Sequence, residues 1–280
     1  MREYLQTLDR EAGLGHAEFN SAPKYLSETD PAAAWSVKGG AAAFGYETNY
    51  LLDSAGGVIV DVEATPARLS QEIIAAKTMI DRTEDCFALK AKRLAADMSY
   101  GTGSFLTWLM EKDVEPHIPV LDRSKQTDGK LTREHFTFDA GGNFYTCPAG
   151  KRLSYRGKSN TKRIYTYCAD PQDCGSCALR QQCTSGPARK LGRHWDEEVR
   201  EAVKALAGTE AFARSSRERK KVEMRFADMK RHLGIRRLKL RGLKGADEEF
   251  TLAAADQNIK TLIKHAFPPG GPSTAVPSTA

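Results

Sequence analysis

Long apolar runs are missing from this sequence of 280 residues. No stretch approaches the roughly 18 consecutive apolar residues of a transmembrane helix, so the sequence predicts no such helix. The first fifteen residues, MREYLQTLDREAGLG, are too acidic and polar for a secretory signal. We therefore expect a cytoplasmic protein with no membrane contact. Hydrophobic residues still make up 40% of the chain, which is enough for the core of one large domain or two small ones.

A strong overall charge is also absent, because the net charge is only +6. The excess is nevertheless concentrated in residues 214–244, where only Glu218, Glu223 and Asp228 are acidic. Such a segment favours a polyanionic partner such as double-stranded DNA, although a solvated helix face is the simpler interpretation. The basic residues of the segment are Arg214, Arg217, Arg219, Lys220, Lys221, Arg225, Lys230, Arg231, Arg236, Arg237, Lys239, Arg241 and Lys244.

Cysteine is rare outside one region, since five of the six cysteines lie between residues 147 and 183. In a cytosolic protein this crowding favours a metal over disulfides. Cys174, Cys177 and Cys183 have a spacing that suits one tetrahedral Zn²⁺. The best fourth ligand is Cys147, in the turn-forming segment YTCPAG, and Cys168 and His194 compete for the place. The alternative is a set of unrelated reduced cysteines, and no pattern typical of a catalytic zinc occurs.

Periodicity along the chain predicts alternating helices and strands, which favours a mixed α/β domain. Residues 1–40 indicate an irregular lead-in with at most short helices, and residues 268–280 have the composition of a disordered tail. Residues 122–195 interrupt the pattern with polar turns and extended aromatic pieces, as an insertion would. The expected elements are a hairpin at 45–53 and 58–64, a helix at 68–84, strands at 94–96 and 115–121 around a helix at 103–112, and helices at 195–215, 216–232 and 248–266.

Two carboxylates stand where phosphoryl-transfer chemistry would need them. Asp97 follows a short apolar strand, and strand ends are where open α/β sheets build ligand sites. Glu223 lies on a predicted helix. Arg219 and Lys230 share its side of this helix, whereas Val222, Phe226 and Met229 lie on another side. An ordinary ion pair explains Arg219 equally well. Carboxylates of this kind can hold the two Mg²⁺ ions that activate and stabilise oxygens in phosphoryl transfer.

Several separate segments follow one another in a distinctive order. They are TDPAA at 29–33, GYETN at 45–49, AADMSY at 95–100, PHIP at 116–119, YTCPAG at 145–150, CGSC at 174–177 with ALR and Cys183, RKKVEMRF at 219–226, KRHLG at 230–234, RGL at 241–243, and Asn258. In this shared order they resemble the DDE transposases of bacterial insertion sequences whose RNase H-like domain carries a cysteine-bearing insertion.

The resemblance implies an RNase H-like mixed sheet flanked by helices, formed by residues 41–121 and 196–267 and interrupted by the probable zinc-binding insertion at 122–195. It makes Asp97 and Glu223 catalytic Mg²⁺ ligands, and it assigns DNA contacts to Arg219, Lys230, Arg236, Arg237 and Arg241. Ser216 stands where the family's glutamate helix often has tyrosine. Relatives act on element ends as dimers, so a homodimer is implied.

The family's first catalytic aspartate has no counterpart in residues 1–28, and its usual DNA-binding region is missing too. We therefore expect a truncated transposase that is inactive alone, unless Asp30, Asp53 or Asp61 supplies the third acid. A catalytically inactive DNA-binding remnant is the main alternative. A zinc-stabilised module that binds protein is a further one, and it predicts that loss of Arg219 and Lys230 leaves DNA affinity unchanged.

Overall fold

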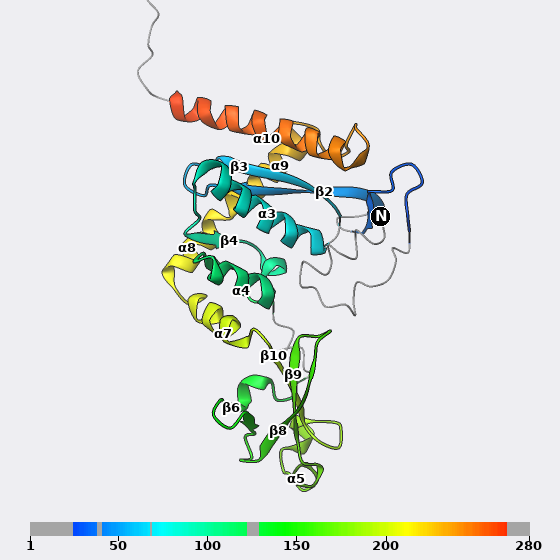
Figure 1. The fold of residues 1–280 in the computed structure, drawn as a ribbon, viewed down its shortest axis with the longest axis vertical. Coiled ribbons are helices and arrows are strands. Elements are labelled where there is room, and N and C mark those ends of the chain that lie inside the picture. The colour runs from blue at the N-terminus through cyan, green and yellow to red at the C-terminus, as the bar shows by residue number, and fades with distance from the viewer. Residues whose placement is uncertain (1–24, 38–40, 68, 122–128, 268–280) are drawn as a thin grey trace, which may run out of the picture. The chain divides into compact units, whose positions relative to one another are not determined.

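The computed structural model describes residues 25–37, 41–67, 69–121 and 129–267. The expected disordered tail and most of the expected lead-in therefore lie outside the described residues. Those that are described form two compact units. Unit 1 comprises residues 25–91 and 214–267, and unit 2 comprises residues 92–213. Both helices and strands build the fold, so the predicted mixed α/β class is confirmed (Figure 1).

Unit 1 is built on a three-stranded antiparallel sheet in the order β1-β2-β3. The strands are β1 (Ala34–Ser36), β2 (Ala43–Leu52) and β3 (Ile59–Pro66). The predicted hairpin is confirmed as β2 and β3, and Gly57 takes a positive φ of 71° in the turn between them. The prediction of an irregular lead-in was wrong at β1, because this strand pairs with Ala43–Gly45 of β2.

The two faces of β3 meet different helices because successive strand residues point to opposite sides. Val62 and Ala64 join a hydrophobic cluster with helices α9 (Lys220–Arg231) and α10 (Gly242–Ala266). Asp61 and Glu63 instead accept hydrogen bonds from Arg82 on α3 (Leu69–Phe87), which is the helix predicted at 68–84. Unit 1 is therefore a sheet covered on both faces.

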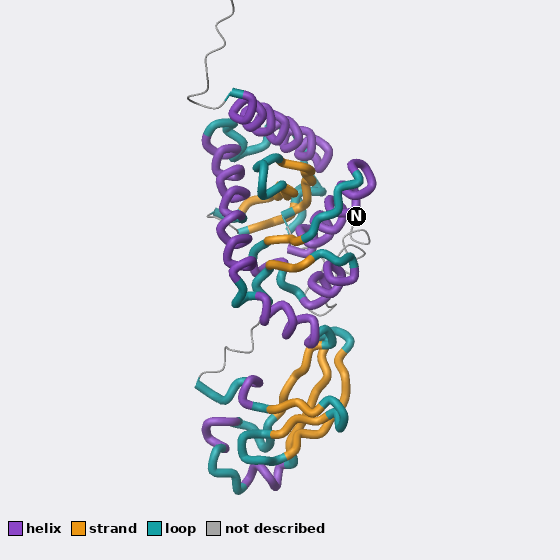
Figure 2. Tube along the Cα trace, turned by 90° about the vertical axis from the view of Figure 1, so that its left-hand side faces the viewer, coloured by secondary structure: helices purple, strands orange, loops and turns teal. Residues whose placement is uncertain are grey.

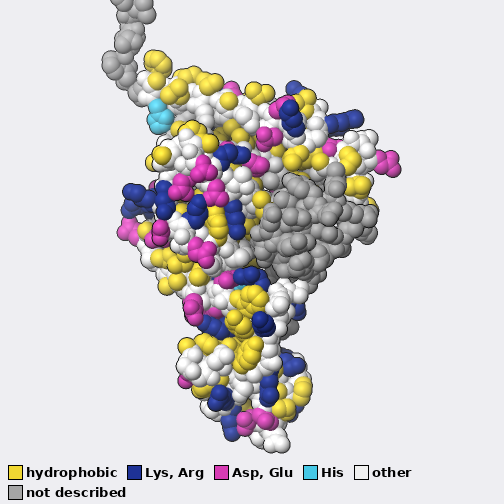
Figure 3. Space-filling model, in the orientation of Figure 1, with side chains coloured by type: hydrophobic (Ala, Val, Ile, Leu, Met, Phe, Trp, Pro, Cys, Tyr) yellow, Lys and Arg dark blue, Asp and Glu magenta, His cyan; other side chains and the backbone are white. Residues whose placement is uncertain are grey.

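Polar side chains on α10 hold this helix against β3 by hydrogen bonds to the strand's backbone. The amide of Asn258 accepts a hydrogen bond from the backbone N–H of Ile59 and donates one to its carbonyl oxygen, both at 2.8 Å. Asp247 accepts from the N–H of Ala64 at 3.0 Å. The predicted final helix begins six residues early, at Gly242. Apolar side chains on its outer side, including Leu252, Ile259 and Leu262, stay exposed (Figure 3).

Unit 2 contains a parallel strand pair with a helical crossover. Strands β4 (Arg93–Ala95) and β5 (Glu115–His117) are joined by the short helix η1 (Met98–Tyr100) and by α4 (Gly103–Glu111). The crossover buries Phe105, Leu106 and Leu109 of α4, which packs against α7 (Glu197–Leu206). Both predicted strands are present, but the second ends four residues before the predicted 121.

A five-stranded antiparallel sheet, in the order β10-β9-β8-β7-β6, forms the rest of unit 2 (Figure 2). Its strands are β6 (Thr137–Asp139), β7 (Phe144–Thr146), β8 (Arg152–Ser159), β9 (Ile164–Ala169) and β10 (Lys190–His194). Tyr145, Leu153 and Tyr167 are the centre of its own hydrophobic core. The sequence predicted only the first two strands, as extended aromatic pieces.

The two helices predicted at 195–215 and 216–232 are in fact three. They are α7, α8 (Glu210–Glu218) and α9. Thr209 causes the first break because its hydroxyl accepts a hydrogen bond from the N–H of Phe212 and donates to the carbonyl of Leu206. In the part of the chain that is described, no helix is long and apolar enough to cross a membrane.

Candidate functional site

Asp97 lies just beyond β4, at the carboxyl end of the parallel strand pair, as the sequence predicted. Its carboxylate caps η1 by accepting hydrogen bonds from the N–H of Ser99, at 2.8 Å, and from the hydroxyl of Ser99. The side chain is exposed. One carboxylate is thus held at a strand end in a fixed orientation while solvent, and hence a cation, can reach it.

Glu223 lies in the first turn of α9. On another side of the helix Phe226 stacks on Tyr50 with ring centroids 5.0 Å apart, and Met229 is buried. These contacts fix the rotation of α9 and leave the Glu223 side chain 58% exposed. Arg219 pairs with it at 3.0 Å, which is the ordinary ion pair that the sequence left open. An exposed pair of this kind contributes only about 0 to 1 kcal/mol, so a cation could readily displace Arg219.

Asp97 belongs to unit 2 and Glu223 to unit 1. The three other acids considered from the sequence all have structural partners. Asp30 accepts from the hydroxyl of Tyr46 at 2.6 Å and from the N–H of Gly242 at 3.1 Å. Burial, and then this hydrogen bond, raise the pKa of Tyr46 above its usual range.

Asp53 and Asp61 also accept hydrogen bonds from other residues of unit 1. Asp53 closes the β2–β3 turn by accepting from the N–H groups of Ala55 and Gly56. Both oxygens of Asp61 accept from Arg82, at 2.8 and 2.9 Å. This hydrogen bonding, against an opposing effect of burial, raises the pKa of Arg82. Each of the three aspartates therefore serves to hold the fold of unit 1 together.

The basic residues assigned to DNA contact are largely at the surface. Lys230, Arg236, Arg237 and Arg241 are exposed, and all but Lys230 lie in the connection between α9 and α10. Glu249 holds this connection because its carboxylate accepts from the N–H groups of residues 239 and 240. These hydrogen bonds hold the backbone of the connection that carries Arg236, Arg237 and Arg241, just before α10.

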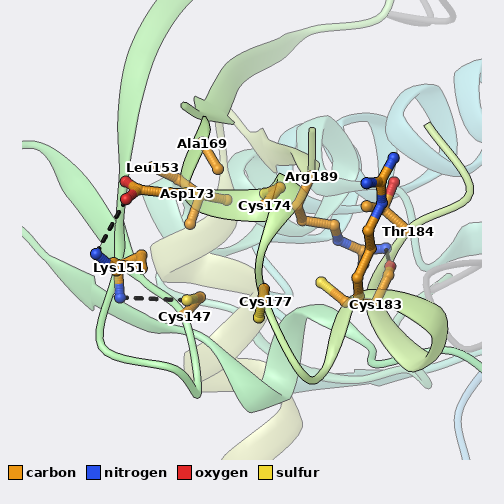
Figure 4. A pocket seen from close by; sticks show the side chains of 11 residues that line it. Cys147, Lys151, Leu153, Ala169, Asp173, Cys174, Cys177, Cys183, Thr184 and Arg189 are labelled. Carbon is orange, nitrogen blue, oxygen red and sulfur yellow. Dashed lines mark hydrogen bonds and ion pairs between the residues drawn. The ribbon is translucent and has the colours of Figure 1, made fainter. Parts of the chain in front are cut away.

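The four cysteines proposed as zinc ligands line one cavity of about 30 Å³ in unit 2. Figure 4 shows Cys174 and Cys177 drawn between Cys147 and Cys183. They come from the loop after β7, from α5 (Pro171–Gly175) and the turn that follows it, and from α6 (Arg180–Cys183). The two competing candidates, Cys168 and His194, do not line the cavity.

A tight turn presents Cys147. The N–H of Cys147 donates to the carbonyl of Lys151, the N–H of Gly150 donates to the carbonyl of Cys147, and Gly150 has a positive φ of 73°. The N–H of Lys151 then donates to Sγ of Cys147 at 3.3 Å, a contact that would stabilise a thiolate (Figure 4). Burial raises the pKa of Cys183, which disfavours its thiolate, while the nearby Arg189 acts in the opposite direction.

Metal-binding geometry is not preformed in the described residues. Among them, no group of three or more His, Cys, Asp and Glu side chains is arranged to hold a metal ion. The four thiols around one cavity fit Zn²⁺ by their chemistry, and the carboxylates of Asp97 and Glu223 fit Mg²⁺ by theirs. The zinc site would require the four thiols to move together.

Comparison with known proteins gives a match over part of the chain. No curated protein and no solved structure matches the chain. Residues 146–263 match the family model described as transposase DDE domain. The matched segment includes the four clustered cysteines and Glu223, whereas Asp97 precedes it. This segment of the chain is thus similar to a transposase DDE domain.

Proposed function

We propose that this chain is a transposase that holds divalent metal ions with Asp97 and Glu223 and acts on the ends of a mobile DNA element by strand cleavage and transfer. The observation that carries the proposal is the position of Glu223, inside the segment that matches the transposase DDE domain. Its side chain is exposed on α9, and the stacking of Phe226 on Tyr50 fixes the rotation of this helix. Asp97, at the end of β4, supplies a second oxygen ligand.

Each side chain has a definite task in this proposal. Metal ions, when bound, would activate the attacking oxygen and stabilise the leaving oxygen. Ser99 orients the Asp97 carboxylate, and Arg219 holds Glu223 until a cation takes its place. Lys230, Arg236, Arg237 and Arg241, with Arg219, hold the phosphate backbone of double-stranded DNA, and the chain acts as a homodimer on paired ends.

The fold that we propose is RNase H-like, with the β2–β3 hairpin, α3 and the β4–β5 pair as its elements. Residues 122–195 form the insertion. In such a site a third carboxylate is needed. Asp30 and Asp61 are part-buried and accept hydrogen bonds from Tyr46 and Arg82, whereas Asp53 is exposed and caps a turn much as Asp97 caps η1. The engagement of Asp30 and Asp61 favours a second candidate function, a catalytically inactive protein that still binds element ends.

The insertion is proposed to bind one structural Zn²⁺ through Cys147, Cys174, Cys177 and Cys183. The shared cavity and the N–H contact to Sγ of Cys147 support this assignment. The metal would join the β7–β8 turn to α5 and α6, which are short helices with no large core of their own. Its contribution would be to stability rather than to the reaction.

The test is Mg²⁺-dependent nicking of a supercoiled plasmid that carries the DNA flanking the gene. Any nicking by the chain should fall about 100-fold or more in Asp97→Asn and in Glu223→Gln. Asp170→Asn is the control for the first variant because Asp170 also caps a helix, accepting from the N–H of Gln172 at 2.8 Å. Glu248→Gln is the control for the second, since Glu248 is also exposed on a helix and paired with a cation four residues away.

The outcomes separate the two candidate functions. Nicking that is lost in both site variants and kept in both controls supports the catalytic function. Binding of the flanking DNA without nicking supports the inactive DNA-binding protein. A chain that neither binds nor nicks this DNA contradicts both.

A further inference from the structure

A second cavity, with a volume of about 450 Å³, lies entirely within unit 1. Three segments that are far apart in the sequence line it: the β2–β3 turn, one side of α9 and the last turns of α10. We call it the basic cleft. Its charged and titratable side chains are Lys221, Arg225, Asp228, Lys260, Lys264 and His265.

The cleft has an excess of positive charge. Lys221, Arg225, Lys260 and Lys264 face a single acid of the lining, Asp228, which itself contacts His232 at 2.7 Å outside the lining. Lys260 also pairs with Asp256 at 2.7 Å. Cations that line a concave surface focus the electrostatic field and attract anions more strongly than the same charges on a convex surface.

Two of the cations are already held in position by the backbone of the β2–β3 turn. Nζ of Lys221 donates to the carbonyl of Ser54 at 2.5 Å. Arg225 donates to the carbonyl of Gly57 and to the hydroxyl of Thr261, both at 2.6 Å. Since the cations are fixed before any ligand arrives, an anion would lose little free energy in ordering them.

The cleft lies on a different side of α9 from the candidate catalytic carboxylate. Lys221 and Arg225 are each two residues from Glu223, so they point about 200° away from it around the helix axis. The core residues Phe226 and Met229 occupy the side between them. A DNA backbone in the cleft would therefore be a different stretch from the one at Glu223.

We propose that the basic cleft binds the sugar-phosphate backbone of double-stranded DNA at a position separate from the reacting strand. This proposal rests on the proposed function, because it takes DNA as the substrate. Contacts of this kind fix the position of the duplex on the protein without reading its sequence. The cleft would thus hold DNA of any sequence beside the end that is cut.

The test is the affinity of the full chain for a fluorescent 30-base-pair duplex of arbitrary sequence, measured by anisotropy over a range of salt concentrations. The variant is Lys260→Gln with Lys264→Gln, at two exposed positions of α10. We expect its affinity to fall on the order of tenfold at 0.1 M salt, and the slope of log affinity against log salt to decrease by about 2. The matched control, Lys158→Gln with Lys190→Gln, removes the same charge at exposed positions of unit 2.

Each outcome has one meaning. A control pair that binds like the unmodified chain, beside a weakened cleft pair, supports the proposal. Equal weakening of both pairs, or a cleft pair that binds normally, overturns it while the catalytic proposal stands. Displacement of the duplex by inorganic phosphate at matched ionic strength would make this a site for free phosphate, and it also overturns the proposal. If the unmodified chain binds no duplex, the proposed function fails as well.

Discussion

Glu197 is the most completely buried acid among the described residues, with only 1% of its side chain exposed. It accepts a hydrogen bond from Arg133, lies 3.6 Å from Nε of Arg200, and accepts from the N–H of His194 at 3.2 Å. Burial alone would raise the pKa of Glu197, but the hydrogen bond and charge of Arg133, together with Arg200, outweigh it. The pKa is therefore lowered below its ordinary value of 4.5.

This lowered pKa predicts a pH-dependent stability. A carboxyl group with a lower pKa in the folded state stabilises the fold above pH 4.5, and this contribution is lost as the pH falls through the folded-state pKa. Glu197→Gln should therefore cost about 3 kcal/mol of unfolding free energy at pH 7, and the difference from the unmodified chain should shrink below pH 4.5. Urea unfolding measured at several pH values checks this.

The neighbouring Glu198→Gln is the control, because the side chain of Glu198 is 90% exposed. We expect it to change the unfolding free energy little at any pH. A Glu197→Gln variant that is as stable as this control at pH 7 would contradict the role of the buried carboxylate.

Among the elements, local sequence signals predicted the helices and the β2–β3 hairpin, but they did not predict most strands of the antiparallel sheet in unit 2. The spacing of Ile73, Ala76 and Ile80 identified α3 because those side chains do face the core. β8 was missed because its exposed residues, such as Arg156 and Lys158, are polar and a bulge between Tyr155 and Gly157 interrupts its alternation. The basic cleft was missed because the three segments that line it are far apart in the sequence.

The cysteine-bearing loops of unit 2 are predicted to bind zinc. The chain purified without chelators should contain about one Zn²⁺, as a tetrahedral four-cysteine site would. Cys147→Ser should reduce the zinc content to near zero, measured by elemental mass spectrometry. Chelation by EDTA should lower the melting temperature.

Cys86 and Cys168 supply the matched controls, because Cys86 is exposed on α3 and Cys168 lies on β9 outside the cavity. Cys86→Ser and Cys168→Ser should keep the zinc. Loss of zinc in Cys168→Ser with retention in Cys147→Ser would show that the fourth ligand is assigned wrongly, and a chain without zinc would contradict the site.

At the scale of the whole molecule, the two candidate metal ligands come from different units: Asp97 from unit 2 and Glu223 from unit 1. The sequence singled out both side chains from their local settings, a strand end and a basic helix. It could not reveal that Asp30, Asp53 and Asp61 have structural partners, because those hydrogen bonds depend on the folded chain.

The proposed metal binding by Asp97 and Glu223 is tested by replacing Mg²⁺ with Fe²⁺ in the DNA-bound chain, adding ascorbate and peroxide, and mapping where the radicals formed at the metal cut the protein backbone. We predict cuts near residue 97 that are lost in Asp97→Asn, and cuts near residue 223 that are lost in Glu223→Gln. Cuts near only one of these residues, or cuts that the variants leave unchanged, would contradict metal binding by both carboxylates.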